Sequence, residues 1–383
     1  MKKVVLILTL ILATGVLNAQ SFSVLLDRIQ ALPAGEKTKL LDEYFSGNHA
    51  VPVIENNHTV YFIYKGIASS VSVAGDATGW APTLKMQKIA GTDYWVVSSQ
   101  YEADARLEYK IVVDDTNWKL DPMNERVAHG GMGDNSELLM PQYEPAQYIY
   151  ERDAVPWGTC ADTVIYSWYL KQKRELRIYL PPDYKVTDAL YPVIIFHDGF
   201  ELFDRMAVRN VLDNMIFERK IRPVIAVFVQ PVRRDGEYSG KLQRNYTNFI
   251  TRELVGFIDA NYRTVKSPDY RATAGISNGG NIALWLAASH PGMFGKAGAQ
   301  SGNVEKNVLK AFGSQDLSAS KIYLDFGKYD LPDLVPKVRN LKKVLEERNI
   351  RHVYNEYPEG HNWGNWQKHL PEMLEYLFPR DGD

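Results

Sequence analysis

Residues 272–281, with the sequence ATAGISNGGN, decide the fold of this chain. A short apolar run leads into Gly275, and a helical run begins at Asn281. A serine on a tight turn between a strand and a helix needs small flanking residues, which Gly275 and Gly279 supply. Such a turn lifts the Ser277 hydroxyl above a sheet and places it at a helix N-terminus, where negative charge is favoured. We therefore expect a nucleophile elbow here; the alternative is a glycine-rich turn carrying a solvated serine.

The chain on either side of this turn alternates between apolar runs typical of strands and amphipathic runs typical of helices. Strands are expected at 176–180, 193–196, 224–229, 272–274, 321–326 and 352–357, and helices at 206–220, 249–262, 281–289, 334–348 and 366–378. Such alternation implies βαβ units and a mostly parallel sheet. We assign residues 160–383 to one α/β domain, whose ligands should bind at the carboxyl ends of the strands.

A serine nucleophile needs a general base, which follows it in the chain of this class of fold. Downstream of Ser277 the candidates are His290, His352, His361 and His369. His361 lies just after the last expected strand and before the last helix. The other three fall at the end of a helix, at the start of a strand and within a helix. We therefore expect His361 to be the base.

The base needs a carboxylate that orients it, and that group should follow the preceding strand. Asp330 lies in the loop after residues 321–326, whereas Asp325 lies inside that strand. Asp333 begins the next helix and would replace Asp330 after a small shift of the loop. We expect Asp330, with Asp333 as the alternative.

Two backbone N–H groups should stabilise the oxyanion of the tetrahedral intermediate. One should be that of Asn278, directly after the nucleophile. The other should come from the loop after residues 193–196, where either Gly199 or Phe200 can supply it. In the same loop Asp198 either tethers the backbone or is a plain turn residue.

Residues 51–143 have a different pattern, in which short runs of alternating apolar and polar residues are separated by turn residues. The strand-like runs are 60–64, 71–73, 94–97 and 108–113. This pattern predicts a small, all-β, immunoglobulin-like antiparallel sandwich. A helical lead, residues 20–50, precedes it, and a proline-containing linker, residues 144–159, follows it.

The first nineteen residues resemble a secretory signal. Lys2 and Lys3 precede a short apolar run, and Ala19 stands at the expected cleavage site. The run is too short to span a bilayer comfortably, and no cysteine follows it that could carry a lipoprotein anchor. We expect the mature protein to be secreted or periplasmic; the alternative is a buried N-terminal helix.

Composition narrows the possible functions. The 383 residues include 44 basic and 46 acidic side chains, a net charge of −2, so a broad electrostatic nucleic-acid surface is not expected. Cys160 stands alone, which excludes an intrachain disulfide and a cysteine-rich metal cluster. No later run approaches the length of a membrane span.

Several motifs of the α/β domain resemble, in order, those of the putative esterase family that includes esterase D, the enterochelin esterases and carbohydrate esterase family 1. The motifs are His197-Asp198-Gly199, Arg234 with Glu237-Tyr238, the DANYR stretch at 259–263, GISNGG at 275–280 and GHNW at 360–363. The resemblance covers roughly residues 160–379 and implies an α/β-hydrolase fold. It assigns the triad to Ser277, Asp330 and His361 and substrate contacts to Asp198, Arg234 and Trp363. The commonest family form has aspartate where Asn362 stands, a difference not expected to affect the triad.

The front domain, residues 51–143, is similar to the early-set sandwiches of glycogen-binding and starch-branching type modules. The resemblance rests on residues 71–80, 109–114 and 118–122. It implies that Trp80 and Trp118 stack on sugar rings, since a flat aromatic face covers the apolar face of a pyranose. The alternatives are that both pack in a core or against the catalytic domain, or that the front domain is a lid.

Together these features predict a secreted serine esterase that hydrolyses feruloyl or acetyl esters on plant polysaccharides. Its partner would be a polysaccharide-linked ester, with no nucleic acid or membrane, and the reaction would need no cofactor or metal. The first alternative is an enterochelin-type siderophore esterase, with a cationic pocket from Arg233, Arg234 and Arg244. The second is a non-catalytic carbohydrate-binding protein. Sequence leaves the oligomeric state open.

Overall fold

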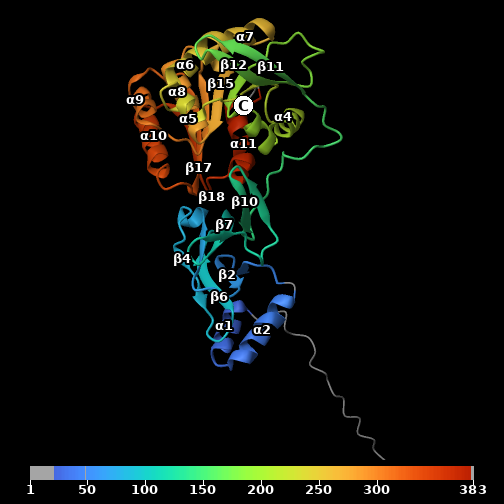
Figure 1. Ribbon diagram of the computed structural model, residues 1–383. Helices are drawn as coiled ribbons and strands as arrows, with labels where there is room; N and C mark the ends of the chain where they lie inside the picture. The colour runs from blue at the N-terminus through green and yellow to red at the C-terminus, as the bar shows by residue number, and fades with distance from the viewer. Residues whose placement is uncertain (1–20, 48, 381–383) are drawn as a thin grey trace, which may run out of the picture.

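The computed structural model describes residues 21–47 and 49–380, so the predicted signal lies outside the described residues. Figure 1 shows an α/β part at the top and a smaller β part below it, with the first two helices at the far end. No helix in these ranges is long and apolar enough to cross a membrane.

The α/β part is built on one twisted sheet with the order β11-β12-β14-β13-β15-β16-β17-β18. Its strands are β11 (Thr159–Ser167), β12 (Gln172–Leu180), β13 (Val193–His197), β14 (Ile225–Val229), β15 (Arg271–Ile276), β16 (Lys296–Gln300), β17 (Lys321–Tyr329) and β18 (Arg351–Gly360). The strands from β14 to β18 are parallel, and β12 and β11 extend the sheet antiparallel at one edge. The predicted α/β-hydrolase architecture with a mostly parallel sheet is confirmed.

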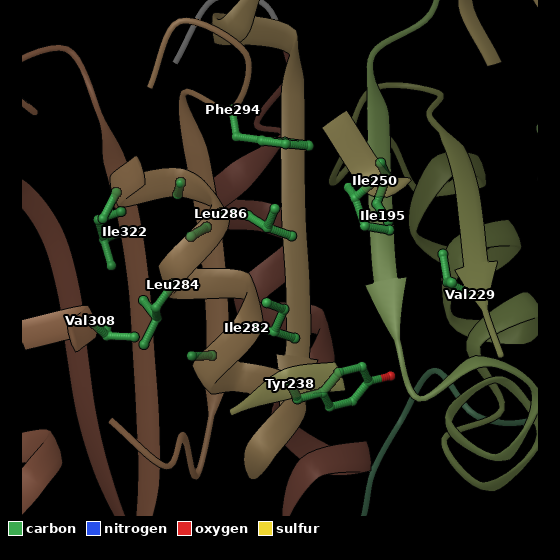
Figure 2. Close-up of a cluster of buried hydrophobic side chains, with 14 of the residues drawn as sticks. Ile195, Val229, Tyr238, Ile250, Ile282, Leu284, Leu286, Phe294, Val308 and Ile322 are labelled. Carbon is green, nitrogen blue, oxygen red and sulfur yellow. The ribbon is translucent and has the colours of Figure 1, made fainter. Parts of the chain in front are cut away.

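Helices cover both faces of this sheet. They are α3 (Gly199–Arg205), α4 (Val208–Phe217), α5 (Arg234–Tyr238), α6 (Gln243–Asn248), α7 (Val255–Asn261), α8 (Asn278–Ser289), α9 (Lys306–Ser314), α10 (Val335–Glu347) and α11 (Trp363–Leu377). A π-helical segment, Phe249–Leu254, leads into α7, and a short 3₁₀ turn, Pro268–Tyr270, precedes β15. One face packs α5 to α10 in a core that Figure 2 shows in part, and the other packs α3, α4 and α11. The sheet is therefore buried on both sides, which explains why its central strands are almost continuously apolar.

The β part is a sandwich of two sheets. One sheet contains β1 (Val53–Glu55), β2 (Thr59–Lys65), β5 (Gln87–Lys88) and β6 (Tyr94–Gln100). The other contains β3 (Val71–Gly75), β4 (Leu84–Lys85), β7 (Arg106–Val113), β8 (Asn117–Lys119), β9 (Val127–Gly130) and β10 (Gly133–Leu139), with a 3₁₀ turn, Asp76–Thr78, after β3. Alternate residues such as Phe62, Leu107 and Tyr109 fill the space between the sheets.

The two N-terminal helices close the outer face of the first sheet. In α1 (Phe22–Gln30) and α2 (Ala34–Ser46), Phe22 and Leu41 are fully buried against Ile63 and Tyr94 of the sheet. The helical lead thus belongs to the front sandwich rather than to the α/β part. Its distance from the carboxyl ends of the parallel strands keeps it away from the candidate site (Figure 1).

The sheets of the two parts meet. Glu359, near the end of β18, pairs in parallel with Arg106 at the start of β7, so the second sheet of the sandwich continues the α/β sheet. Residues 140–158, which connect the two parts along the chain, contain no helix or strand. The junction lies two residues before His361, and it therefore brings the sandwich to the predicted base.

Candidate active site

Ser277 stands on a sharp turn between β15 and α8, as the glycine spacing predicts. Its backbone has φ 51° and ψ −121°, values that a residue with a side chain rarely adopts. A Cβ on Gly275 would lie 2.5 Å from the backbone of Gly279, and one on Gly279 would lie 2.4 Å from an Asp198 carboxylate oxygen. Both glycines are therefore required by close approach, and Ser277 stands half-buried at the tip of the turn.

The three residues predicted for the triad lie in line. His361 Nε2 is 3.0 Å from Ser277 Oγ, and His361 Nδ1 is 2.6 Å from Asp330 Oδ1. The Asp330 side chain is fully buried and also accepts a hydrogen bond from the Leu331 N–H at 2.7 Å. Asp333, the alternative acid, is exposed and makes no such contact with the histidine. The geometry suits a base between a nucleophile and an orienting carboxylate.

The imidazole of His361 is also held from the side. The Trp366 ring meets it edge-to-face with centroids 4.9 Å apart. Trp366 is fixed in turn, because its Nε1–H donates to Ser301 Oγ at 2.9 Å. The contact with Trp366 therefore restricts the rotation of the His361 ring.

The loop after β13 lies beside the elbow. Phe200 N–H donates to Gln230 Oε1 at 3.0 Å, so this N–H is engaged. Gly199, with φ 48°, packs so closely on Gln230 that a Cβ would lie 2.4 Å from its side-chain oxygen. Of the two open alternatives, Gly199 is therefore the better donor candidate from this loop. Asn278, the other predicted donor, is the first residue of α8, where backbone N–H groups have no partner within the helix.

Asp198 is a structural anchor and not a plain turn residue. It is buried, has φ 73°, and binds both Nε and Nη2 of Arg234, at 2.5 and 2.9 Å. Burial raises the pKa of Asp198, and the Arg234 guanidinium opposes that rise. The preceding His197 is fully buried between Tyr246 and Thr273, and burial lowers its pKa to about 3. His197 is therefore a neutral structural residue, while Arg234 remains partly exposed at the site.

Ser277 and His361 open into a cavity of about 620 Å³ between the two parts of the molecule. The α/β part contributes Asp198, Glu201, Arg234, Ile276, Leu331, Asn362, Trp363 and Trp366. The sandwich contributes Trp80, Glu108, Lys110, Trp118, Asn135 and residues 130–133. The outer face of the second sheet, which carries the polar residues of β7, therefore forms one wall of the site.

Both front-domain tryptophans line this cavity. Trp118 is 42% exposed, and the Trp80 Nε1–H donates to Asp76 Oδ1 at 3.2 Å. They do not form a separate platform away from Ser277, and they do not lie in the core of the sandwich. Of the arrangements that the sequence left open, the structure matches the one in which the front domain reaches over the nucleophile.

Several cavity residues were not predicted from sequence. Glu108 and Lys110 lie on one face of β7, whose residues alternate between charged and apolar side chains, and this alternation was the available signal. Sequence analysis assigned Asn362 no role beyond a difference not expected to affect the triad; in the structure its side chain joins the loop of His361 to the sandwich. Nothing in the local sequence marks those contacts, because the partners are 256 and 286 residues away.

A family model and several known proteins are similar to this chain. Residues 167–377 match the family described as putative esterase. The uncharacterized protein YjcH of Bacillus subtilis is 28% identical over 236 residues, which are 58% of this chain and 98% of that protein. An endo-1,4-beta-xylanase/feruloyl esterase of Xylanibacter ruminicola is 27% identical over 258 residues, which are 63% of this chain and 34% of that protein.

A solved structure extends the likeness to the front sandwich. The enterobactin esterase FES from Shigella flexneri, crystallised in the presence of enterobactin, superposes with a TM-score of 0.69 at 21% identity. The superposition covers 88% of this chain and 97% of that chain. At this identity the likeness concerns the fold, and its coverage extends beyond the α/β part.

Proposed function

The chain belongs to the putative esterase family, and on that premise we propose that it is a serine carboxylic ester hydrolase acting on feruloyl or acetyl esters of plant polysaccharides such as xylan. The observation that carries the proposal is the line of hydrogen bonds from Asp330 through His361 to Ser277, which ends in a cavity lined by four tryptophans. The sequence relative whose name includes feruloyl esterase supports the substrate class.

In the proposed mechanism Ser277 Oγ attacks the ester carbonyl while His361 Nε2 takes its proton. Asp330 orients the ring and stabilises the imidazolium that forms. The N–H of Asn278, with that of Gly199, would hold the oxyanion. His361 then protonates the leaving alcohol. In the second half of the reaction His361 takes a proton from water, which attacks the acyl-enzyme, and returns that proton to Ser277 Oγ as the acid leaves.

The lining of the cavity supports an aromatic acyl group or a sugar as the bound part of the substrate. Trp80, Trp118, Trp363 and Trp366 present flat apolar surfaces, and aromatic pairs contribute roughly 0.5–1.5 kcal/mol beyond area burial. Arg234 and Lys110, which line the cavity, offer donors to hydroxyl or methoxy oxygens. We therefore place feruloyl esters ahead of acetyl esters.

A siderophore trilactone is the second candidate, because the fold of an enterobactin esterase matches both parts of this chain. Its ferric catecholate form is strongly anionic and would need a cationic pocket. Of the three arginines that the sequence suggested, only Arg234 lines the cavity. Lys110 also lines the cavity, but so do three acidic residues, Glu108, Asp198 and Glu201, so cations do not dominate the pocket.

A panel of methyl ferulate, acetylated xylan and a catecholate trilactone tests the proposal. We expect the highest kcat/KM on methyl ferulate, measured by release of the free acid. A preference of tenfold or more for the trilactone would replace the feruloyl assignment with the siderophore one. Absence of turnover of any ester, including a simple aryl ester, would favour a non-catalytic carbohydrate-binding protein.

We also propose that the protein is exported. The support is the charged start and apolar run of residues 1–19. N-terminal mass spectrometry of the protein from the source cell should find a chain that begins near residue 20. A cytoplasmic chain that retains Met1 would contradict export.

A further inference from the structure

The two chain neighbours of His361 are both held by the front sandwich. Asn362 Nδ2 donates to Asp76 Oδ2 at 2.9 Å, and Arg106 Nη1 donates to Asn362 Oδ1 at 2.8 Å. On the other side of the histidine, a Cβ on Gly360 would lie 2.0 Å from the Asp76 carboxyl carbon. The carboxyl group of Asp76 therefore rests directly on the backbone that carries the base.

The sandwich side of this contact is itself fixed. Asp76 is 3% exposed and accepts hydrogen bonds from the Glu108 N–H at 2.8 Å and from the Trp80 indole. Arg106 is 6% exposed and forms ion pairs with Glu108 at 3.2 Å and Glu137 at 2.6 Å. Because the sandwich holds both side chains, they fix the loop of His361 relative to the sheet and do not move with the loop.

Asn362 carries the contact into the last helix as well. Its Oδ1 accepts the Asn365 N–H at 3.1 Å and so caps α11, the helix that brings Trp366 against the imidazole. The side-chain amide of Asn362 thus holds the chain after His361, caps the start of α11 and ties both to the sandwich. An aspartate at this position would have no side-chain N–H to offer Asp76.

We propose that Asp76 and Arg106 are positioning residues for the base, so that the front sandwich sets the His361 ring in line between Ser277 and Asp330 through Asn362 and Gly360. The inference rests on the esterase function proposed above and adds a second role for the sandwich beyond lining the cavity. Displacement of a reacting group by about 1 Å costs on the order of 100-fold in rate, so a loss of this support should appear in kcat.

Three variants separate positioning from general damage to the sandwich. Asp76→Ala removes the acceptor. Asp76→Asn keeps one oxygen, which can still accept from Asn362 and the Glu108 N–H, and it removes the negative charge, which burial already disfavours by raising the pKa of Asp76. Asp121→Ala is the matched control, because Asp121 is an equally buried carboxylate whose partners, Tyr109 and Met123, belong to the sandwich.

Each variant is assayed with p-nitrophenyl acetate, and the unfolding midpoint in urea is recorded in parallel. We expect Asp76→Ala to lower kcat by about 10- to 100-fold with KM changed less than threefold, and Asp76→Asn to recover at least tenfold of that loss. Asp121→Ala should lower the unfolding midpoint comparably and keep kcat within about twofold. Equal kcat for Asp76→Ala and wild type, or an equal loss in Asp121→Ala, would overturn the proposal.

A second readout does not depend on the substrate. The proton between His361 Nδ1 and Asp330 should give a downfield NMR signal, which we expect to be preserved in Asp121→Ala and lost or shifted in Asp76→Ala. If wild type hydrolyses no ester while this signal still moves in Asp76→Ala, the proposed function fails and the positioning role stands. An unmoved signal in a folded Asp76→Ala variant would count against positioning whatever the enzyme hydrolyses.

Discussion

At the scale of single residues, the backbone of Ser277 is strained whether or not the hydroxyl is present, because β15, α8 and the glycines dictate the turn. Ser277→Ala should therefore keep the fold and lower aryl-ester turnover by about 10⁴-fold or more, since the members of a triad act as a unit. Stopped assays with long incubation measure the residual rate. More than a tenth of wild-type activity in a clean preparation would exclude Ser277 as nucleophile.

Asp330 and Asp333 form a matched pair for testing the acid. Asp330→Asn presents an amide to His361 Nδ1 and favours the wrong imidazole tautomer, so kcat should fall by roughly 10⁴-fold. Asp333→Asn changes an exposed side chain and should stay near wild type. The comparison uses kcat on the same aryl ester, and a larger loss in Asp333→Asn would reverse the assignment.

His197 gives a prediction about acid stability. Burial lowers its pKa in the folded protein to about 3, whereas the unfolded chain takes up a proton near 6.5. The folded state therefore loses stability as the pH falls from about 6.5 towards 3, by up to about 1.4 kcal/mol per pH unit from this group. Urea unfolding at pH 7, 5.5 and 4.5 should show a shallower loss in His197→Gln than in wild type. Parallel curves for the two proteins would contradict this origin.

At the scale of elements, the first turn of α8 is packed against the loop after β13. In Gly279→Ala the new methyl group would lie 2.4 Å from the Asp198 carboxylate, which also binds Arg234. We expect this variant to lose at least tenfold in kcat and to be less stable than wild type. Gly256→Ala in α7 is the control, because a Cβ there meets nothing within 4 Å; it should gain about 0.5–1 kcal/mol in urea unfolding. Unchanged kcat in Gly279→Ala would mean that the loop is free to move.

Some of these elements and site residues could be predicted from the sequence, and others could not. The elbow, His361 and Asp330 follow from local signals: glycine spacing, and polar residues just beyond strand ends. The helix expected at 249–262 begins with a π-helical segment at 249–254, which the apolar pattern of the sequence does not distinguish from ordinary helix. Asp76 follows a strand and precedes a glycine-containing turn, so it reads as a turn residue; its contact with Asn362 depends on how two sheets meet, which no local pattern encodes.

At the scale of the whole molecule, the cavity needs both parts of the chain. Replacing Trp80 and Trp118 together by alanine should lower kcat/KM by about tenfold or more, on methyl ferulate as well as on xylan-bound ferulate, because both rings line the cavity that contains Ser277. Trp168→Ala is the control, since Trp168 is 78% exposed on the turn after β11 and lies outside the cavity. A defect confined to xylan-bound ferulate would show that the two rings anchor polymer and do not contact the acyl group.

The pairing of Glu359 with Arg106 has a consequence for how such chains can be recombined. A chimaera joined within residues 140–158 would keep every residue of the triad and would inherit a foreign sandwich. Unless the graft restored the pairing at Arg106 and a carboxyl group at the position of Asp76, the loop of His361 would lose the support that the sandwich gives it through Gly360 and Asn362. The front sandwich therefore cannot be exchanged freely between such chains. We expect Asp76 and Arg106 to change in evolution only together with the residues of the loop from Glu359 to Asn362.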